Sequence, residues 1–361
     1  MQKSKLDFSG YNIFAGIDVH KKSWSVHVVS DVIEHGAFTQ APDPQKLSGY
    51  LKKHFPGATY HSVYEAGFCG FWIHDALIQE GINNIVVNAA DIPTTNKEKT
   101  QKRDKVDCKK LARSLRNNQL RPIYIPSREL LEERMLVRGR YKLIRNRTRC
   151  KNRIKASFNY YGINIPEELD TGRWSGKLKE WMKTTPMQYC CGRAALDLYL
   201  QELEGLEHVI KENTRQITLL SKTKKYEQNT ELLCTIPGIG FIVAMTILTE
   251  LGDINRFRSL DQLNSYIGMV PNVSASGDTE RVGHLTHRGN DILKCQLIES
   301  AWVAIRRDPA LMLQYQELTK RMKPNKAIIR IVRKLVNRIR YVLKNQQPYE
   351  IGVVILAPIK C

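Results

Sequence analysis

The 361-residue sequence lacks a run of apolar residues close to the ~20 that a membrane-spanning helix needs. Its longest largely apolar stretches are short ones such as Ile242–Leu248, and Met1–Asp7 lacks the apolar segment of a signal peptide. The eight cysteines are scattered without a CxxC pair. This distribution argues against a disulfide scaffold and against a structural zinc site. We therefore expect a soluble intracellular protein whose thiols are reduced.

Acidic residues are scarce relative to basic ones. The chain has 36 Asp and Glu against 56 Lys and Arg, which gives a net charge of +20. Because clustered cations release condensed counterions from a polyphosphate, this excess favours nucleic acid over a membrane as the partner. A hydrophobic content of 42% is enough to bury real cores and excludes wholesale disorder. The length fits roughly two or three domains.

Residues 1–125 have the pattern of an α/β domain. Ile13–Val19 and Trp24–Ser30 are short β-rich runs joined by a Lys-Lys turn, which predicts a hairpin. Candidate strands and helices then alternate along the chain. The candidates are a helix over Pro42–Phe55, a strand over His61–Ala66, a helix over Phe71–Glu80, a strand over Asn84–Asn88 and a helix over Lys105–Asn117. This order predicts a mixed sheet with helices packed on it.

Residues 126–225 are predicted to be helical and to include a strongly basic helix. Arg134–Lys155 contains ten basic residues and no acid. Such a run can be a solvated face, but uncompensated like charges repel, so we expect contacts with nucleic acid. The candidate phosphate ligands in it are Arg138, Arg145, Arg149 and Arg153.

The same region contains a heptad seam with steps of three and four. Its members are Leu196, Tyr199, Leu203, Leu206, Ile210, Asn213, Ile217 and Leu220. A seam this narrow must pack against another helix. That helix could belong to a second copy of the chain, or it could be the basic helix of the same chain in an antiparallel hairpin. The sequence leaves both pairings open.

Residues 226–345 are predicted to be helices and loops, followed by a tail over 346–361. A Pro-Gly-Ile-Gly turn joins two helical stretches, and its Gly238 and Gly240 could let backbone amides approach a phosphate or could simply allow close packing. Tyr266–Asn290 is polar and glycine-rich and is expected to be a loop. Met322–Asn345 predicts a second basic amphipathic helix, packed on the core with an outer face suited to phosphates.

Four carboxylates in the first domain fit a common purpose. Asp18 and Glu65 end apolar strands, and Asp104 and Asp107 share one face at the start of a helix. Each alone is typical of a turn or a helix cap. Together, as hard oxygen donors without a His or Cys cluster, they favour Mg²⁺ or Mn²⁺ and could hold two ions on a phosphodiester. Acids on a first strand, a middle strand and a late helix are how an RNase H-like nuclease fold supplies such a site.

The motifs around these acids resemble those of a known family. Gly-Ile-Asp-Val-His-Lys, Tyr-Glu-Ala-Gly and Lys-x-Asp-x-x-Asp-x-x-Lys-Leu-Ala are similar to the DEDD transposases of the one-ten family of bacterial insertion sequences. Leu-Cys-Thr-Ile-Pro-Gly-Ile-Gly, Glu-Leu-Gly-Asp-Ile-Asn-Arg-Phe, Tyr-Ile-Gly-Met-Val-Pro, Ser-Gly-Asp and His-Arg-Gly-Asn-Asp-Ile-Leu resemble its C-terminal domain. The similarity runs in the family's order from about Phe14 to Trp302. The family also includes Piv-type DNA invertases.

The resemblance implies an architecture and a set of catalytic residues. It implies a RuvC-like RNase H domain with acids at Asp18, Glu65, Asp104 and Asp107, a helical coiled-coil linker and a mainly α-helical C-terminal domain. It also implies a serine nucleophile, which is Ser276 before a glycine, with Ser274 as the alternative if the alignment slips. Arg281 and Arg288 lie near this serine in the sequence and are candidate nucleic-acid contacts.

The resemblance further implies a reaction and its partners. The reaction is strand cleavage through a covalent 5′-phosphoserine, assisted by Mg²⁺ or Mn²⁺. The partners are donor DNA, target DNA, a guide (bridge) RNA and further copies of the chain in a dimer or tetramer. The expected location is the bacterial cytoplasm, at the nucleoid. The third motif departs from the family slightly, because Cys108 follows its last Asp where Ala is frequent.

Two other functions are compatible with the residues. The first is a metal-dependent nuclease of the Holliday-junction type, which would use the four acids with water and form no covalent intermediate. The second is a nucleic-acid binding protein without catalytic activity. A covalent protein–DNA adduct would distinguish the recombinase from both alternatives, and metal-dependent cutting that survives loss of Ser276 would identify the nuclease.

Overall fold

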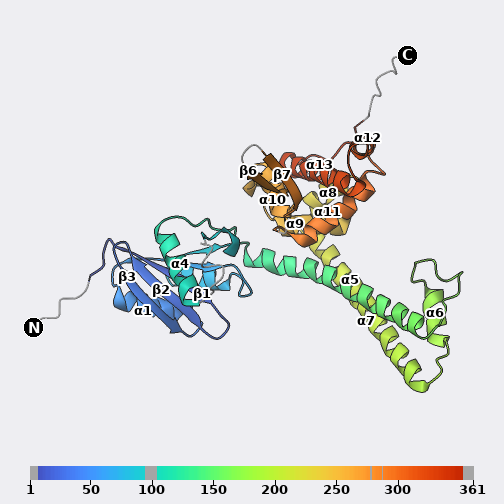
Figure 1. The fold of residues 1–361 in the computed structure, drawn as a ribbon, viewed down its shortest axis with the longest axis horizontal. Helices are drawn as coiled ribbons and strands as arrows, with labels where there is room; N and C mark the ends of the chain where they lie inside the picture. The colour runs from blue at the N-terminus through green and yellow to red at the C-terminus, as the bar shows by residue number, and fades with distance from the viewer. Residues whose placement is uncertain (1–6, 94–103, 277–278, 287, 353–361) are drawn as a thin grey trace, which may run out of the picture. The chain divides into compact units, whose positions relative to one another are not determined.

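The computed structural model describes residues 7–93, 104–276, 279–286 and 288–352, without the side chains of 104–105 and 273–282 (Figure 1). Contacts divide the chain into two compact units, Met1–Pro126 and Ser127–Cys361. In the described part of the chain, no helix has both the length and the apolar character needed to cross a membrane.

The first unit is built on a five-stranded sheet with the strand order β3-β2-β1-β4-β5. Its strands are β1 (Asn12–Val19), β2 (Trp24–Ser30), β3 (Glu34–Gln40), β4 (Thr59–Glu65) and β5 (Asn83–Val87). Strands β1 and β2 pair in antiparallel orientation, which confirms the predicted hairpin, whereas β4 runs parallel to β1 and β5 parallel to β4. Edge strand β3 is mostly exposed, so it carries little of the apolar pattern that identifies a strand from sequence.

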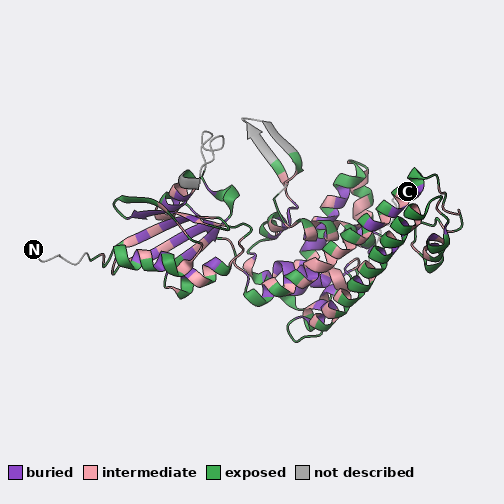
Figure 2. Cartoon of the chain, turned by 90° about the horizontal axis from the view of Figure 1, so that it is seen from below, coloured by how far each residue is buried: buried purple, intermediate pink, exposed green. Residues whose placement is uncertain are grey.

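Helices cover both faces of this sheet. They are α1 (Pro44–His54), α2 (Trp72–Gln79) and α4 (Asp104–Arg116), with the short 3₁₀ helix η1 (Ala89–Asp91). Leu47 of α1 and Leu77 of α2 share a core with the β1 residue Ile17, while Leu111 of α4 packs with Val63 of β4 on the other face. In Figure 2 the strands of this sheet carry many buried residues, which are coloured purple. The mixed α/β prediction is confirmed, and the RNase H-like assignment stays a prediction.

The second unit begins with two long helices, α5 (Arg128–Tyr160) and α7 (Cys190–Ser221), which lie side by side in Figure 1. The Asn213 amide donates to the Leu136 carbonyl at 3.2 Å, and Arg153 pairs with Glu202 at 2.7 Å. The contact made earlier in α5 involves the later residue of α7, and the contact made later in α5 involves the earlier one, so the two helices are antiparallel. Short helix α6 (Gly176–Thr184) packs beside them.

The heptad seam on α7 is used within the chain. Seam residues Leu196 and Leu203 are buried with Ile154 and Phe158 of α5. The intramolecular hairpin is therefore correct, and the seam is not free to join two copies, because α5 already covers it. A dimer or tetramer stays a prediction that needs another surface.

The rest of this unit is a helical core with a small hairpin. Its helices are α8 (Glu227–Cys234), α9 (Phe241–Leu251), η2 (Ile254–Arg256), α10 (Leu260–Ile267), α11 (Asp291–Ala304), α12 (Pro309–Thr319) and α13 (Pro324–Asn345). Val137 of α5 and Ile217 of α7 belong to the same core as these helices, so the predicted regions 126–225 and 226–345 share it.

The expectation of a loop over Tyr266–Asn290 is wrong. Strands β6 (Pro271–Ser276) and β7 (Thr279–Leu285) form an antiparallel hairpin there. The apolar residues of β6 alternate with polar ones but are small, and most residues of β7 are polar, so the hydrophobic signal was weak. The two residues between them, Gly-Asp, are a hairpin-turn pair that could have revealed the structure.

Candidate active site

Asp18 and Glu65 lie at the ends of neighbouring parallel strands. The last register pair between β1 and β4 joins Ile17 to Tyr64, and each acid is the next residue on its strand. Since side chains alternate between faces, Asp18 shares the face of Gly16, and Glu65 shares the face of Val63. This is the face that α4 covers.

Helix α4 crosses β1 at very short range. A Cβ atom on Gly16 would lie 2.1 Å from the carbonyl oxygen of Cys108, so only glycine fits there. Further along α4, Arg113 pairs with Glu34. Glu34 is opposite Val29 near the end of β2, and Val29 is opposite Phe14 near the start of β1. The helix therefore runs antiparallel to β1, and its first turn lies toward the end of β1 that carries the acids.

Asp107 is in this first part of α4. The pKa of the neighbouring Cys108 thiol is raised to about 11, chiefly by burial and in part by the negative charges of Asp18 and Asp107. Both carboxylates therefore lie within electrostatic range of the same thiol. Asp104 is the first residue of α4, but its side chain lies outside the described part. The backbone thus brings Asp18, Glu65 and Asp107 to one end and one face of the sheet.

The donor set suits a hard divalent cation, because all the candidate ligands are carboxylate oxygens. Among the described side chains, however, no three of the types His, Cys, Asp and Glu gather as a metal-binding group. The fourth predicted ligand, Asp104, is not among these side chains. Asp18 also has a neighbour that was not among the predicted site residues, His20, whose Nε2 lies 3.2 Å from the Asp18 carboxylate.

The predicted nucleophile is at the end of the β6–β7 hairpin. Ser276 is the last residue of β6 and pairs with Thr279, while Ser274 pairs with Arg281. The side chains of Ser274, Ser276 and Arg281, and the residue Gly277, lie outside the described part. Both serines therefore lie on β6, two residues apart, with Ser276 at the end of the strand.

The two ends of this hairpin are held against each other. Gly268 before β6 adopts a φ of +88°, and a Cβ atom there would lie 2.7 Å from the carbonyl oxygen of Arg288. The Thr286 amide donates to the Val270 carbonyl at 3.0 Å, and the Asn290 amide donates to the Tyr266 carbonyl at 3.2 Å. This close approach fixes where the hairpin leaves the helical core.

A fully buried carboxylate, Glu250, connects this region to the basic helix. Its side chain is 0% exposed and accepts from Arg138 Nε at 2.5 Å and from Arg138 Nη2 at 2.7 Å. The side-chain amide of Asn290 donates to the Glu250 carboxylate at 2.6 Å, and Arg134 donates to the Thr249 carbonyl at 3.0 Å. Glu250 therefore ties α5 to α9 and to the segment that follows the hairpin.

Glu250 was missed by sequence reasoning, although it is the only acid in the otherwise apolar stretch that forms α9. Its partner Arg138 was predicted to bind phosphate. In the structure the guanidinium makes a two-pronged ion pair with Glu250, which raises the pKa of Arg138, and 42% of the side chain stays exposed. Its contact with phosphate stays a prediction. The acids that compensate the basic run are distant in sequence, so no local pattern shows the pairing.

The other predicted phosphate contacts have different surroundings. Arg153 pairs with Glu202, whereas Arg145 and Arg149 are exposed on α5. Arg288 is also exposed. These arginines stay predicted contacts.

Of the two turn glycines, Gly238 serves packing. A Cβ atom there would lie 2.3 Å from the Ser300 carbonyl oxygen of α11. This contact supports the packing role that the sequence left open, and the phosphate role of Gly238 stays a prediction. Gly240 is exposed at the start of α9, and its phosphate role stays a prediction.

Comparison with known proteins identifies the family. Residues 15–162 match a family model for DEDD transposases of the IS110 type, described as a transposase, and residues 230–316 match the model "Transposase IS116/IS110/IS902 family". The chain belongs to the IS110 (one-ten) family of DEDD transposases. The first match spans all four predicted acids of this transposase, and the second spans Glu250, Ser274 and Ser276.

Individual transposases are similar over much of the chain. "Putative transposase y4rJ" of Sinorhizobium fredii is 28% identical over 300 residues, covering 76% of this transposase and 74% of that protein. The transposase for insertion sequence element IS1111A of Coxiella burnetii is 25% identical over 265 residues, covering 70% of each. The function class is therefore that of an insertion-sequence transposase.

Proposed function

We propose that this transposase cleaves and rejoins DNA strands through a covalent phosphoserine at Ser276, directed by a bridge RNA. The observation that carries the proposal is the register of β1 and β4, which makes Asp18 and Glu65 neighbours on the face under the first turn of α4. With Asp104 and Asp107, they would hold Mg²⁺ or Mn²⁺. A divalent cation bound there would supply charge neutralisation at the scissile phosphate.

The serine step exchanges one phosphoester for another. The Ser276 Oγ attacks the phosphorus, the Oγ–P bond forms and the bond from phosphorus to the 3′ oxygen breaks. The serine proton leaves Oγ, and the departing 3′ oxygen takes up a proton. The products are a 5′-phosphoserine and a free 3′-hydroxyl, so the phosphoester is conserved and the reverse attack can rejoin a strand without ATP. The anchored ends of the β6–β7 hairpin support this role, since a nucleophile must be held in place.

Trapping the adduct tests the serine. We would incubate the full chain, the element's bridge RNA and labelled cognate DNA in Mg²⁺, and separate covalent protein–DNA species on a denaturing gel. The Ser276→Ala variant should lose the adduct, and the matched Ser274→Ala variant should keep it. The reverse result would move the nucleophile to Ser274. Cutting by Ser276→Ala without any adduct would identify a nuclease of the Holliday-junction type instead.

The acids need a separate test, because each could matter only for folding. Asp18→Asn and Glu65→Gln remove ligand charge at strand ends without removing core atoms. Both should abolish strand cleavage while DNA binding and the melting temperature stay close to those of the unmodified chain. Full cleavage by either variant in Mg²⁺ would refute the proposed metal site.

A further inference from the structure

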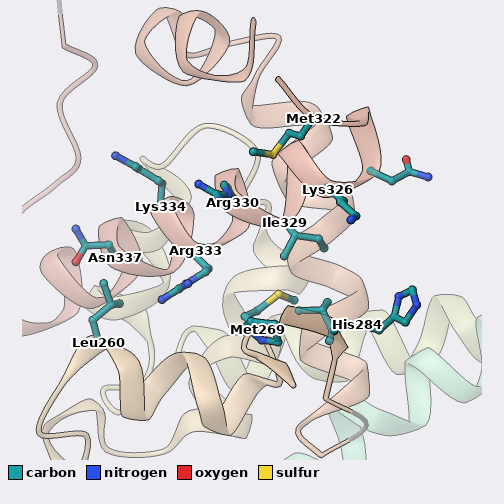
Figure 3. Close-up of a pocket in the computed structure, with 14 residues that line it drawn as sticks. Leu260, Met269, His284, Met322, Lys326, Ile329, Arg330, Arg333, Lys334 and Asn337 are labelled. Carbon is teal, nitrogen blue, oxygen red and sulfur yellow. The ribbon is translucent and has the colours of Figure 1, made fainter. Parts of the chain in front are cut away.

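A groove of ≈1050 Å³ lies in the second unit between α13 and the β6–β7 hairpin. Figure 3 shows Lys326, Arg330 and Lys334 along α13 and His284 on the hairpin side. Apolar side chains, among them Met269, line it as well. The hairpin contributes Pro271, Gly283, His284 and Leu285 to its lining. The groove therefore combines a row of cations with an apolar surface.

The cations of this groove form a stripe on one face of α13. Lys326, Arg330 and Lys334 follow each other at intervals of four residues, and all three are exposed. The opposite face of the helix is buried through residues such as Ile331 and Leu335. Arg333 pairs with Asp261 at 3.2 Å, but within the described structure the three stripe residues have no such partner.

An unpaired stripe of this kind does not help the helix to fold. Like charges four residues apart repel, at a cost of about 0.2–0.5 kcal/mol for each pair. The apolar face of α13 already accounts for its packing, so packing does not require cations on the other side. An anionic ligand would relieve the repulsion. The stripe rises by ~12 Å from Lys326 to Lys334, close to the rise of three or four nucleotides in a DNA strand.

We propose that this groove binds the phosphodiester backbone of DNA. The choice of DNA rather than RNA rests on the proposed role of Ser276, because the groove lies at the base of the hairpin that carries this serine. Pro271 lines the groove and begins β6, and Ser276 ends the same strand five residues later. At about 3.3 Å per residue the two are ~17 Å apart along the strand, roughly the rise of five nucleotides. DNA held on the stripe would thus pass near the serine.

Salt-dependent binding tests the groove. The Ser276→Ala chain would carry the triple change Lys326→Ala, Arg330→Ala and Lys334→Ala. Binding to a fluorescein-labelled duplex of the element's end would be measured by anisotropy across a salt series. The plot of log affinity against log salt should become shallower, its negative slope decreasing in magnitude by close to three units. Affinity at the lowest salt should fall by at least about tenfold. The stripe is exposed, so circular dichroism should show an unchanged fold.

The matched control removes the same charge elsewhere in the unit. Lys211, Lys222 and Lys224 are exposed, and replacing all three by Ala should change the slope by less than one unit. Equal losses in the two triple variants, or no loss in the groove variant, would overturn the proposal. A loss seen only with a labelled RNA hairpin of the same length would overturn the assignment to DNA.

This measurement does not depend on chemistry at Ser276, since the serine is absent from every chain used. A failed adduct assay with a groove-dependent slope would refute the nucleophile and leave the groove. An intact adduct with an unchanged slope would refute the groove alone.

Discussion

Replacing Glu250 by Gln should destabilise the second unit severely. The change keeps the shape of the side chain but removes a buried negative charge that accepts two hydrogen bonds from Arg138 and one from Asn290. Breaking a buried ion pair from one side costs about 3–5 kcal/mol. The Arg138 side chain is 42% exposed and can be partly hydrated after the change. We therefore expect the lower end of that range, about 3 kcal/mol.

Urea and thermal unfolding would measure this loss. For a unit of this size, 3 kcal/mol corresponds to a fall of roughly 6–12 °C in melting temperature. Glu231→Gln is the matched control, because Glu231 is exposed on α8 and its replacement should change stability by less than about 0.5 kcal/mol. The double variant Glu250→Gln with Arg138→Met should lose less than the sum of the single changes, since it leaves fewer unpaired charges. A loss below about 1 kcal/mol for Glu250→Gln would refute the reasoning.

Three further predictions concern packing, thiol reactivity and nucleic-acid binding. Gly16→Ala should destabilise the first unit by at least about 2 kcal/mol in urea unfolding, because its Cβ would overlap the backbone of α4; a near-neutral effect would contradict this packing. The pKa of Cys108 is raised to about 11, chiefly by burial, so only ~0.1% of the Cys108 side chains are thiolates at pH 8. Mass spectrometry after iodoacetamide treatment at that pH should find exposed Cys190 modified and Cys108 intact, with modification of Cys108 rising only as the pH approaches 11. Arg145→Ala combined with Arg149→Ala should lower the salt slope for RNA or DNA by about two units, and an unchanged slope would show that these arginines only face solvent.

The sequence predicted the elements of the first unit well because their signals are local. Ile13–Val19 and Trp24–Ser30 are β-rich runs joined by a short turn, and the structure pairs them as the hairpin β1–β2. The second of the two helical stretches predicted around the Pro-Gly-Ile-Gly turn is α9, whose apolar stretch is bracketed by glycines. Strand β3 and the hairpin β6–β7 had weak signals, because edge and surface strands do not need the apolar alternation on which such predictions rely.

The candidate site divides in the same way. That Asp18 and Glu65 end their strands could be read from the sequence, but only the parallel register of β1 and β4 makes them neighbours. Only the structure shows that α4 runs back across Gly16, which brings Asp107 toward them. Strand order and helix direction depend on packing between segments far apart in the chain, and no local pattern records them.

What the sequence determined by itself is the type of each long element, the basic character of the chain and the motifs that define the family. Tertiary structure decided which charges remain available. Arg138 looks like a phosphate ligand in a run without acids, yet it is held by Glu250, 112 residues later. The α7 seam looks like an oligomer interface, yet α5 of the same chain covers it. A side chain's charge and periodicity are local properties, whereas its partner is chosen by the fold, because burial stabilises only those pairings that the packed backbone brings within reach.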